Sequence, residues 1–96
     1  MADFELSGKA DEDLVEIYIY SFQKFGEAKA DAYFLSLEEC FSLLAEQPGI
    51  GRNIDHIRKG YLRHEHGRLS IFFMKNRKGI TIVRVLHQHM DADFRL

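Results

Sequence analysis

The sequence predicts an α+β fold in which an N-terminal helical hairpin packs on an antiparallel β-sheet. Three short runs between residues 61 and 87 alternate apolar with polar residues or are rich in β-branched and aromatic ones, as strands of a half-buried sheet are. Gly67 and residues 76–79 separate these runs and supply turn chemistry. Before residue 48, apolar residues recur at three- and four-residue intervals, which indicates helices. A chain of 96 residues with 46% hydrophobic content fits a single domain over residues 1–96.

A short strand and a first helix are expected at the N-terminus. The strand is predicted for residues 4–6, and Ser7 is well placed as the N-cap of a helix that begins near Lys9. The helix should run to about Phe25, with Gly26 as its C-cap. Its apolar residues span an arc of about 200°, whereas a helix covered on one side needs about 100°; they are Leu14, Val15, Ile17, Tyr18, Ile19, Phe22 and Phe25. We therefore expect cover on two sides, from the sheet and second helix and from a protein partner.

A second helix is predicted for residues 27–47, because apolar residues recur there along one stripe. They are Ala30, Phe34, Leu37, Phe41, Leu44 and Ala45. Pro48 and Gly49 should end this helix, since proline cannot continue it. A single glycine joins the two helices, which favours an antiparallel hairpin. A loop over residues 48–59 leads to strands at about 61–66, 69–75 and 80–87, and residues 88–96 form a polar tail or helical turn.

Charge is unevenly distributed along the chain, although the formal net charge is only -2. Residues 1–47 carry three basic and eleven acidic side chains, a net charge of -8, whereas residues 48–96 carry ten basic and four acidic ones, a net charge of +6. All five histidines also lie in the second half. The basic half could attract an acidic partner or nucleic acid, or the two halves could neutralise each other when they pack.

Cysteine usage and the N-terminus point to a cytoplasmic protein. Cys40 is the single cysteine and lies in a helix-periodic run, where a buried thiol in a reducing compartment is expected. The acidic N-terminus lacks the basic and apolar regions of a signal peptide. No run approaches the roughly 18 apolar residues of a membrane span.

Two pairs of histidines raise the question of a metal site. His64 with His66, and His87 with His89, each place two imidazoles on one face of an extended segment. In a meander the two pairs would start roughly 9 to 10 Å apart, given strand spacings of about 4.8 Å. No acidic or cysteine ligand completes either pair at a recognised spacing, so we expect no metal. No cofactor is expected either, because the glycine-rich residues 48–52 lack the preceding strand that a phosphate-binding loop needs.

Ionisable side chains on the predicted strands could in principle cleave a phosphodiester. A histidine or glutamate would move protons and an arginine would stabilise the phosphate; the candidates are Arg63, Glu65, Arg84, His87 and His89. Nothing in their spacing enforces catalysis, and strand-borne arginines and histidines are more often surface residues or partner contacts. The residues by themselves therefore favour a binding protein over an enzyme.

Short motifs run through the chain in a fixed order. They are Ala10, Asp13-Leu14 and Ile17 in the first helix, Phe25-Gly26 at the joint, Ala30 and Tyr33 in the second helix, Leu44-Ala45 before Pro48, then Gly51-Arg52, Ile57-Arg58, Gly60-Tyr61, His66-Gly67, Ile71-Phe72-Phe73 and residues 83–91, VRVLHQHMD. This ordered set closely resembles the ParE branch of the RelE/ParE toxin superfamily, nearly end to end. The resemblance implies the RelE/ParE-like order βααβββ, which agrees with the periodicity.

The resemblance also implies a function. The chain would be the toxin of a type II toxin-antitoxin system that is not an enzyme and that arrests growth by stabilising the cleaved complex of DNA gyrase with DNA. A ParD-type antitoxin would neutralise it in a hetero-oligomer and supply the second cover for the first helix. The expected antitoxin contacts are Leu14, Ile17, Tyr18, Phe22, Arg63 and Arg84, with the arginines meeting acidic residues of the partner. The expected gyrase contacts are Arg58, Arg68, His87, His89, Met90, Asp91, Phe94 and Arg95.

Three positions depart from the family pattern, and two other functions stay open. Leu62 and Met74 stand where relatives usually carry basic residues, and Ser70 where they often carry histidine, which thins the positive surface. One alternative is a RelE-type toxin that cuts messenger RNA on the ribosome, for which Arg84 and His87 are suitably placed. The clustered lysines and C-terminal tyrosine of that branch are absent. The other alternative is an inert module that only binds its antitoxin.

Overall fold

The computed structural model describes residues 2–87 and 96 and confirms the expected order of elements. The elements are β1 (Asp3–Leu6), α1 (Gly8–Phe25), α2 (Glu27–Glu46), the short 3-10 helix η1 (Pro48–Ile50), β2 (Arg52–Asn53), β3 (Leu62–His66), β4 (Leu69–Lys75) and β5 (Gly79–His87). The segment predicted as a loop over residues 48–59 contains η1 and β2. The predicted tail, apart from Leu96, lies outside the described residues.

The strands form one five-stranded sheet in the order β1-β5-β4-β3-β2. Strands β2 to β5 are antiparallel neighbours, which confirms the predicted meander of the last three. β1 instead pairs in parallel with β5, with Phe4 opposite Ile80, so the sheet is mixed. Periodicity cannot reveal this pairing, because a run of four residues carries no information about its partner or its direction.

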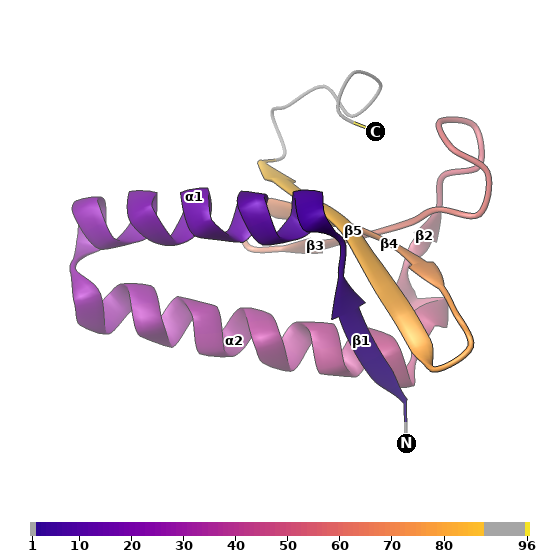
Figure 1. Cartoon of the computed structure of the whole chain (residues 1–96), viewed down its shortest axis with the longest axis horizontal. Helices are drawn as coiled ribbons and strands as arrows, with labels where there is room; N and C mark the ends of the chain where they lie inside the picture. The colour runs from indigo at the N-terminus through magenta and orange to yellow at the C-terminus, as the bar shows by residue number, and fades with distance from the viewer. Residues whose placement is uncertain (1, 88–95) are drawn as a thin grey trace.

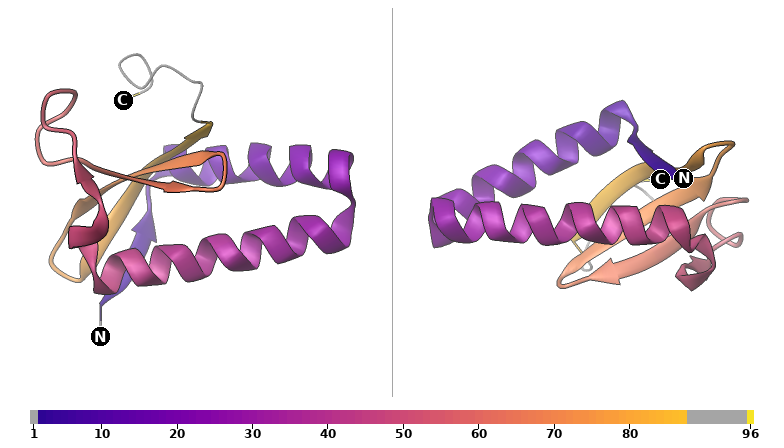
Figure 2. Two further views of the ribbon diagram at one scale, coloured as in Figure 1. Left: turned by 180° about the vertical axis from the view of Figure 1, so that it is seen from behind. Right: turned by 90° about the horizontal axis from the view of Figure 1, so that it is seen from below.

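The two helices form the predicted antiparallel hairpin, and their joint projects away from the sheet (Figures 1 and 2). Ser7 caps α1 as expected, with its Oγ accepting a hydrogen bond of 3.0 Å from the Ala10 N–H. Gly26 ends α1 as expected, at a φ of 90° that glycine reaches without a Cβ clash, and its N–H donates to the Phe22 carbonyl. None of the helices in the described part of the chain is long and apolar enough to cross a membrane.

The core lies between α2 and the sheet. Most of the predicted α2 stripe is buried, and so is Cys40, whose pKa is raised by that burial; the buried residues are Ala30, Leu37, Cys40, Phe41, Leu44 and Ala45. All of these except Ala30 pack on the facing side chains of the sheet, among them Ile71, Phe73 and Ile82. On the other face of the sheet, the loop after β2 brings Ile54 against Phe72 and Leu86. In contrast, α1 buries only Ala10, Asp13 and Ser21.

Gly51 offers a test of this packing, because a side chain there would collide with the core. A Cβ on Gly51 would lie 2.5 Å from Cζ and 2.9 Å from Cε1 of the fully buried Phe73 ring. We expect Gly51→Ala to lower the free energy of unfolding by about 1–3 kcal/mol, the usual cost of overpacking. The control is Gly49→Ala, since a Cβ at that position meets no heavy atom within 4 Å. Urea unfolding that gives the same midpoint for both variants would show that Phe73 moves aside without cost.

Candidate binding surface on the first helix

A row of large apolar side chains on α1 is left uncovered by the described part of the chain. The exposed fractions are 58% for Val15, 50% for Ile19, 46% for Phe22 and 54% for Phe25. Their spacing of three or four residues places them on one side of the helix, together with Tyr18. We call these five residues the α1 apolar face. Contiguous exposed apolar side chains usually mark a site of protein interaction.

An apolar groove adjoins this face, between α1, α2 and β1. It encloses about 290 Å³ and is lined by Phe4, Leu6, Leu14, Phe34, Leu37, Glu38 and Phe41. Tyr18 links the face to the groove, because its ring packs edge-on against the Phe34 ring, with centroids 5.2 Å apart. Its hydroxyl donates to Oδ1 of Asp31 at 2.7 Å, and this bond raises the pKa of Tyr18. The α1 apolar face and the groove therefore form one continuous surface.

The surroundings of this surface are acidic. Asp31 and Glu38 of α2 lie beside the groove, the first bonded to Tyr18 and the second in its lining. Within the bounds of α1 and α2 the sequence has nine acidic and three basic side chains, which gives a net charge of -6. An apolar helix with basic residues along its borders would be complementary to such a surface.

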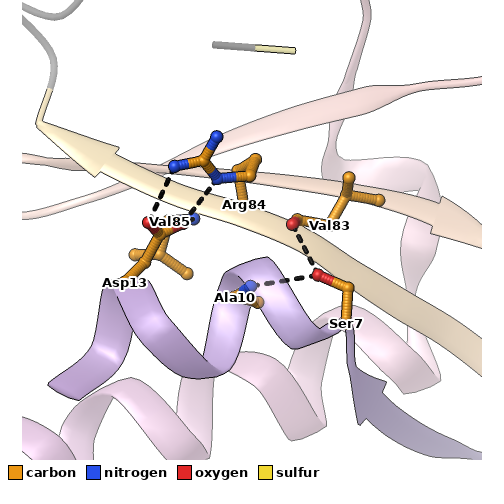
Figure 3. Close-up of polar contacts among 6 residues, drawn as sticks. All are labelled: Ser7, Ala10, Asp13, Val83, Arg84 and Val85. Carbon is orange, nitrogen blue, oxygen red and sulfur yellow. Dashed lines mark hydrogen bonds and ion pairs between the residues drawn. The ribbon is translucent and has the colours of Figure 1, made fainter.

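The side chains of Ser7, the N-cap of α1, and of Asp13 in α1 hold the helix against the edge of β5 that β1 leaves uncovered (Figure 3). β1 pairs with β5 only as far as Ile82. Beyond that point, Ser7 Oγ donates to the Val83 carbonyl at 2.7 Å, and Asp13 Oδ2 accepts from the Val85 N–H at 3.0 Å. These side chains substitute for strand pairing at the edge and fix how α1 lies on the sheet.

Asp13 also forms a bidentate pair with Arg84. The Nε and Nη2 atoms of Arg84 each donate to one carboxylate oxygen of Asp13 at 2.8 Å. Both side chains are largely buried, with 16% of Arg84 and 10% of Asp13 exposed. The hydrogen bonds from Arg84 to Asp13 raise the pKa of the guanidinium. This arginine, expected at the antitoxin interface, therefore joins α1 to β5 within the chain.

The other expected antitoxin contacts divide into two groups. Tyr18 and Phe22 belong to the α1 apolar face, whereas Leu14 and Ile17 are partly buried and pack against the core. Arg63 belongs to the strand residues on the opposite face of the sheet from the main core. There its Nη2 donates to Ser70 Oγ at 2.9 Å, its Nε faces a Glu65 carboxylate oxygen at 3.4 Å, and its guanidinium lies 5.3 Å from the Phe72 ring centre.

Val15, Ile19 and Phe25 were not predicted as binding residues from the sequence, although all three are half exposed. The signal that could have found them was present, because they lie on the same wide apolar arc of the first helix. Dividing that arc into a core side and a free side requires knowing that Leu14 and Ile17 face the core.

The expected gyrase contacts are only partly visible. Arg68 lies in the β3–β4 turn, next to Leu69, which pairs with His87, so these two candidates lie at one end of the sheet. The His87 ring packs edge-on against Tyr20 with centroids 6.2 Å apart. Arg58 lies in the loop after β2, where its Nε donates to the Leu96 carbonyl at 3.0 Å. The remaining five candidates lie outside the described residues: His89, Met90, Asp91, Phe94 and Arg95.

A histidine-serine contact joins β3 to α2 and has the outline of a catalytic pair. His66 Nε2 lies 3.1 Å from Ser36 Oγ. Ser36 Oγ also lies 2.7 Å from the Tyr33 carbonyl of its own helix, and which group donates in the Ser36–His66 contact depends on the tautomer of His66. Within residues 2–87 and 96, no group of three or more histidines, cysteines or carboxylates could hold a metal ion.

His66 predicts how stability depends on pH. Burial lowers the pKa of His66, and nearby His64 lowers it further. The unfolded chain therefore takes up a proton near the ordinary histidine pKa of about 6.5, before the folded chain does. The contribution of His66 to the free energy of unfolding is therefore fully present above that pH. We expect it to be lost as the pH drops from about 6.5 through the folded pKa. His66→Gln should flatten this fall in urea midpoints between about pH 5 and 7.5, whereas His56→Gln, at an exposed position, should not. Equal pH dependence in both variants would assign the effect to other groups.

Comparison with known proteins identifies similar chains over nearly the full length. Residues 4–92 match the family described as ParE toxin of type II toxin-antitoxin system, parDE. Toxin ParE1 of Caulobacter vibrioides is 36% identical over 92 residues, which cover 96% of this chain and 95% of that protein. Toxin ParE1 of Mycobacterium tuberculosis is 37% identical over 92 residues, which cover 95% of this chain and 94% of that protein.

A solved structure has the same fold. That structure is described as the chromosomal ParDE TA system from P. aeruginosa. Its matched chain superposes on the present one with a TM-score of 0.74 at 24% sequence identity. The superposition covers 91% of this chain and 96% of that chain. It supports the arrangement of two helices on a mixed sheet described above.

Proposed function

We propose that this chain, which belongs to the ParE toxin family of type II toxin-antitoxin systems, is held inactive by a ParD-type antitoxin and arrests growth by binding DNA gyrase once released. Family membership confirms the resemblance found in the sequence. The observation that carries the proposal for the antitoxin is the uncovered α1 apolar face beside an apolar groove. In such a system the antitoxin is the protein that would cover it.

The shape and charge of this surface suggest how the antitoxin binds. An amphipathic helix could lay its apolar side over Val15, Ile19 and Phe22, in the manner of helix-in-groove recognition. A following apolar side chain would enter the groove beside Leu14 and Phe34, and basic side chains would approach Asp31 and Glu38.

Arg63 and Arg84 have a different role in this proposal. Both are engaged within the chain, Arg84 by Asp13 and Arg63 by Ser70 and Glu65. We therefore assign them to holding the fold in place. Ile17, which packs on the core, supports the α1 apolar face from below. Acidic residues of the antitoxin are then not required at these arginines.

Gyrase would be inhibited by binding rather than by chemistry. The proposed target surface consists of Arg58, Arg68 and His87 with the C-terminal residues His89, Met90, Asp91, Phe94 and Arg95. Because binding tolerates the loss of one peripheral side chain better than catalysis tolerates the loss of an acid or base, His87→Ala should leave the gyrase effect largely intact.

The purified chain, mixed with gyrase, ATP and supercoiled plasmid, should produce linear plasmid after detergent and protease treatment. Expression without antitoxin should stop growth and induce the DNA-damage response, and co-expression of the cognate antitoxin should restore growth. Defined cuts in ribosome-bound messenger RNA, with no linear plasmid, would establish the RelE-type alternative. Normal growth on expression of the chain alone would establish the inert module.

A further inference from the structure

The β4–β5 turn gathers three cations that have no ion-pair partner within residues 2–87 and 96. Lys75, Arg77 and Lys78 are all exposed and lie within four consecutive residues. Three arginines elsewhere are engaged: Arg52 and Arg63 lie within ion-pair distance of Glu65, and Arg84 is paired with Asp13. The turn is therefore a compact positive surface whose charge is available to another molecule.

Asn76 makes the backbone of this turn rigid. Its Oδ1 accepts from the N–H groups of Lys78 and Gly79, both at 2.8 Å, and its own N–H donates to the Gly79 carbonyl at 3.0 Å. Its Nδ2 donates to Thr81 Oγ1 at 2.8 Å and approaches Glu5 Oε1 at 3.4 Å. The backbone that carries the cationic side chains is thus ordered before any partner arrives, which lowers the ordering cost of binding.

Two carboxylates of β1 lie near the turn but do not cancel its charge. Asp3 pairs in register with Gly79 at the base of the turn. Glu5 lies two residues further along β1, and its Oε1 accepts from the hydroxyl of Thr81 at 3.0 Å. Three cations therefore face two carboxylates, and both carboxylates belong to the neighbouring strand rather than to the turn.

The turn also lies away from the α1–α2 joint. Figure 1 shows the joint at one end of the molecule and the β4–β5 turn at the opposite end. Within their bounds α1 and α2 carry a net charge of -6, whereas the turn carries three cations. A polyanion would approach with the turn first, because the helices repel it.

We propose that the β4–β5 turn contacts the phosphate backbone of duplex DNA. Charged side chains on a rigid turn suffice for such contacts, which are independent of sequence. A protein partner would require a central apolar or aromatic anchor, and residues 75–79 contain no such side chain. The inference rests on the proposed function, because the DNA would be that held by gyrase. The contact itself can be measured without gyrase.

The test is the binding of a fluorescein-labelled duplex to the whole chain, followed by anisotropy over a range of salt concentrations. We expect weak binding at low salt and a linear fall of log K with log salt. Lys75→Gln, Arg77→Gln and Lys78→Gln together should reduce the slope by up to about 2.7, because each phosphate that is neutralised contributes about 0.9 to it. The control combines Lys9→Gln, Lys24→Gln and Lys29→Gln, which removes the same charge from the helices and should leave the slope unchanged.

Three results would overturn the proposal: no salt-dependent binding by the parent chain, an equal reduction of the slope in both triple variants, or binding of poly-glutamate in place of duplex DNA. Circular dichroism should give the same melting temperature for the turn variant and the parent. If the melting temperature of the turn variant is lower, the DNA-binding measurement is repeated with Arg77→Gln alone. Plasmid linearisation by gyrase is scored separately with the parent chain. Its absence would refute the gyrase target while leaving the DNA measurement intact.

Discussion

Asp13→Ala should lower the free energy of unfolding by about 3–5 kcal/mol, the cost of breaking a buried ion pair by removing one partner. The substitution leaves the Arg84 guanidinium, 16% exposed, without the carboxylate that accepts two of its hydrogen bonds. It also leaves the N–H of buried Val85 without its acceptor. Three hydrogen bonds are thus removed at the place where α1 meets β5.

Glu12→Ala is the matched control, because Glu12 is an exposed carboxylate of the same helix. Its removal should change the unfolding free energy by no more than about 0.5 kcal/mol. The double variant Asp13→Leu with Arg84→Met should recover part of the stability, since an apolar pair carries no unpaired charge. The Val85 N–H would stay unpaired, at a cost of about 1–3 kcal/mol. If urea unfolding finds Asp13→Ala as stable as Glu12→Ala, the pair contributes little and solvent already screens it.

Local chemistry made much of the fold predictable. The Ser7 cap and the Gly26 end of α1 each depend on a few adjacent residues, and both are confirmed. The α2 stripe was predictable because five of its six expected residues are buried, four of them against the sheet, and only Phe34 is partly exposed at the groove. The antiparallel β3, β4 and β5 follow from short turns, which leave adjacent strands little choice of partner.

Features that depend on distant parts of the chain were not predictable in the same way. β1 pairs with β5 across more than seventy residues, and its four residues carry no mark of that choice. A similar separation in sequence explains why the role of Arg84 was missed. The strand pattern alone predicts a surface cation there, but Arg84 pairs with Asp13 of α1. The candidate binding surface was half predictable: the apolar arc was visible in α1, but which half packs on the core depends on how Asp13 fixes the helix on the sheet.

Phe22→Asp should weaken antitoxin binding by about 100-fold or more, because it removes a central contact of the α1 apolar face and places a charge there. Phe22 is 46% exposed and thus has much of its ring free to be buried by a partner. Burying a phenylalanine contributes about 1.5–3 kcal/mol, and tenfold in affinity corresponds to about 1.4 kcal/mol. The new carboxylate would in addition be desolvated beside a surface that already carries Asp31 and Glu38.

Leu35→Asp provides the control for exposure and for the added charge. Leu35 is 60% exposed on α2, about 100° around the helix axis from Phe34, and does not line the groove. Calorimetry with the cognate antitoxin should find nearly parental affinity for this variant. Phe22→Asp should still arrest growth when expressed alone, since the proposed gyrase surface is elsewhere, but co-expressed antitoxin should no longer restore growth. If both variants bind the antitoxin as tightly as the parent, the antitoxin covers another part of the toxin and the α1 apolar face has a different occupant.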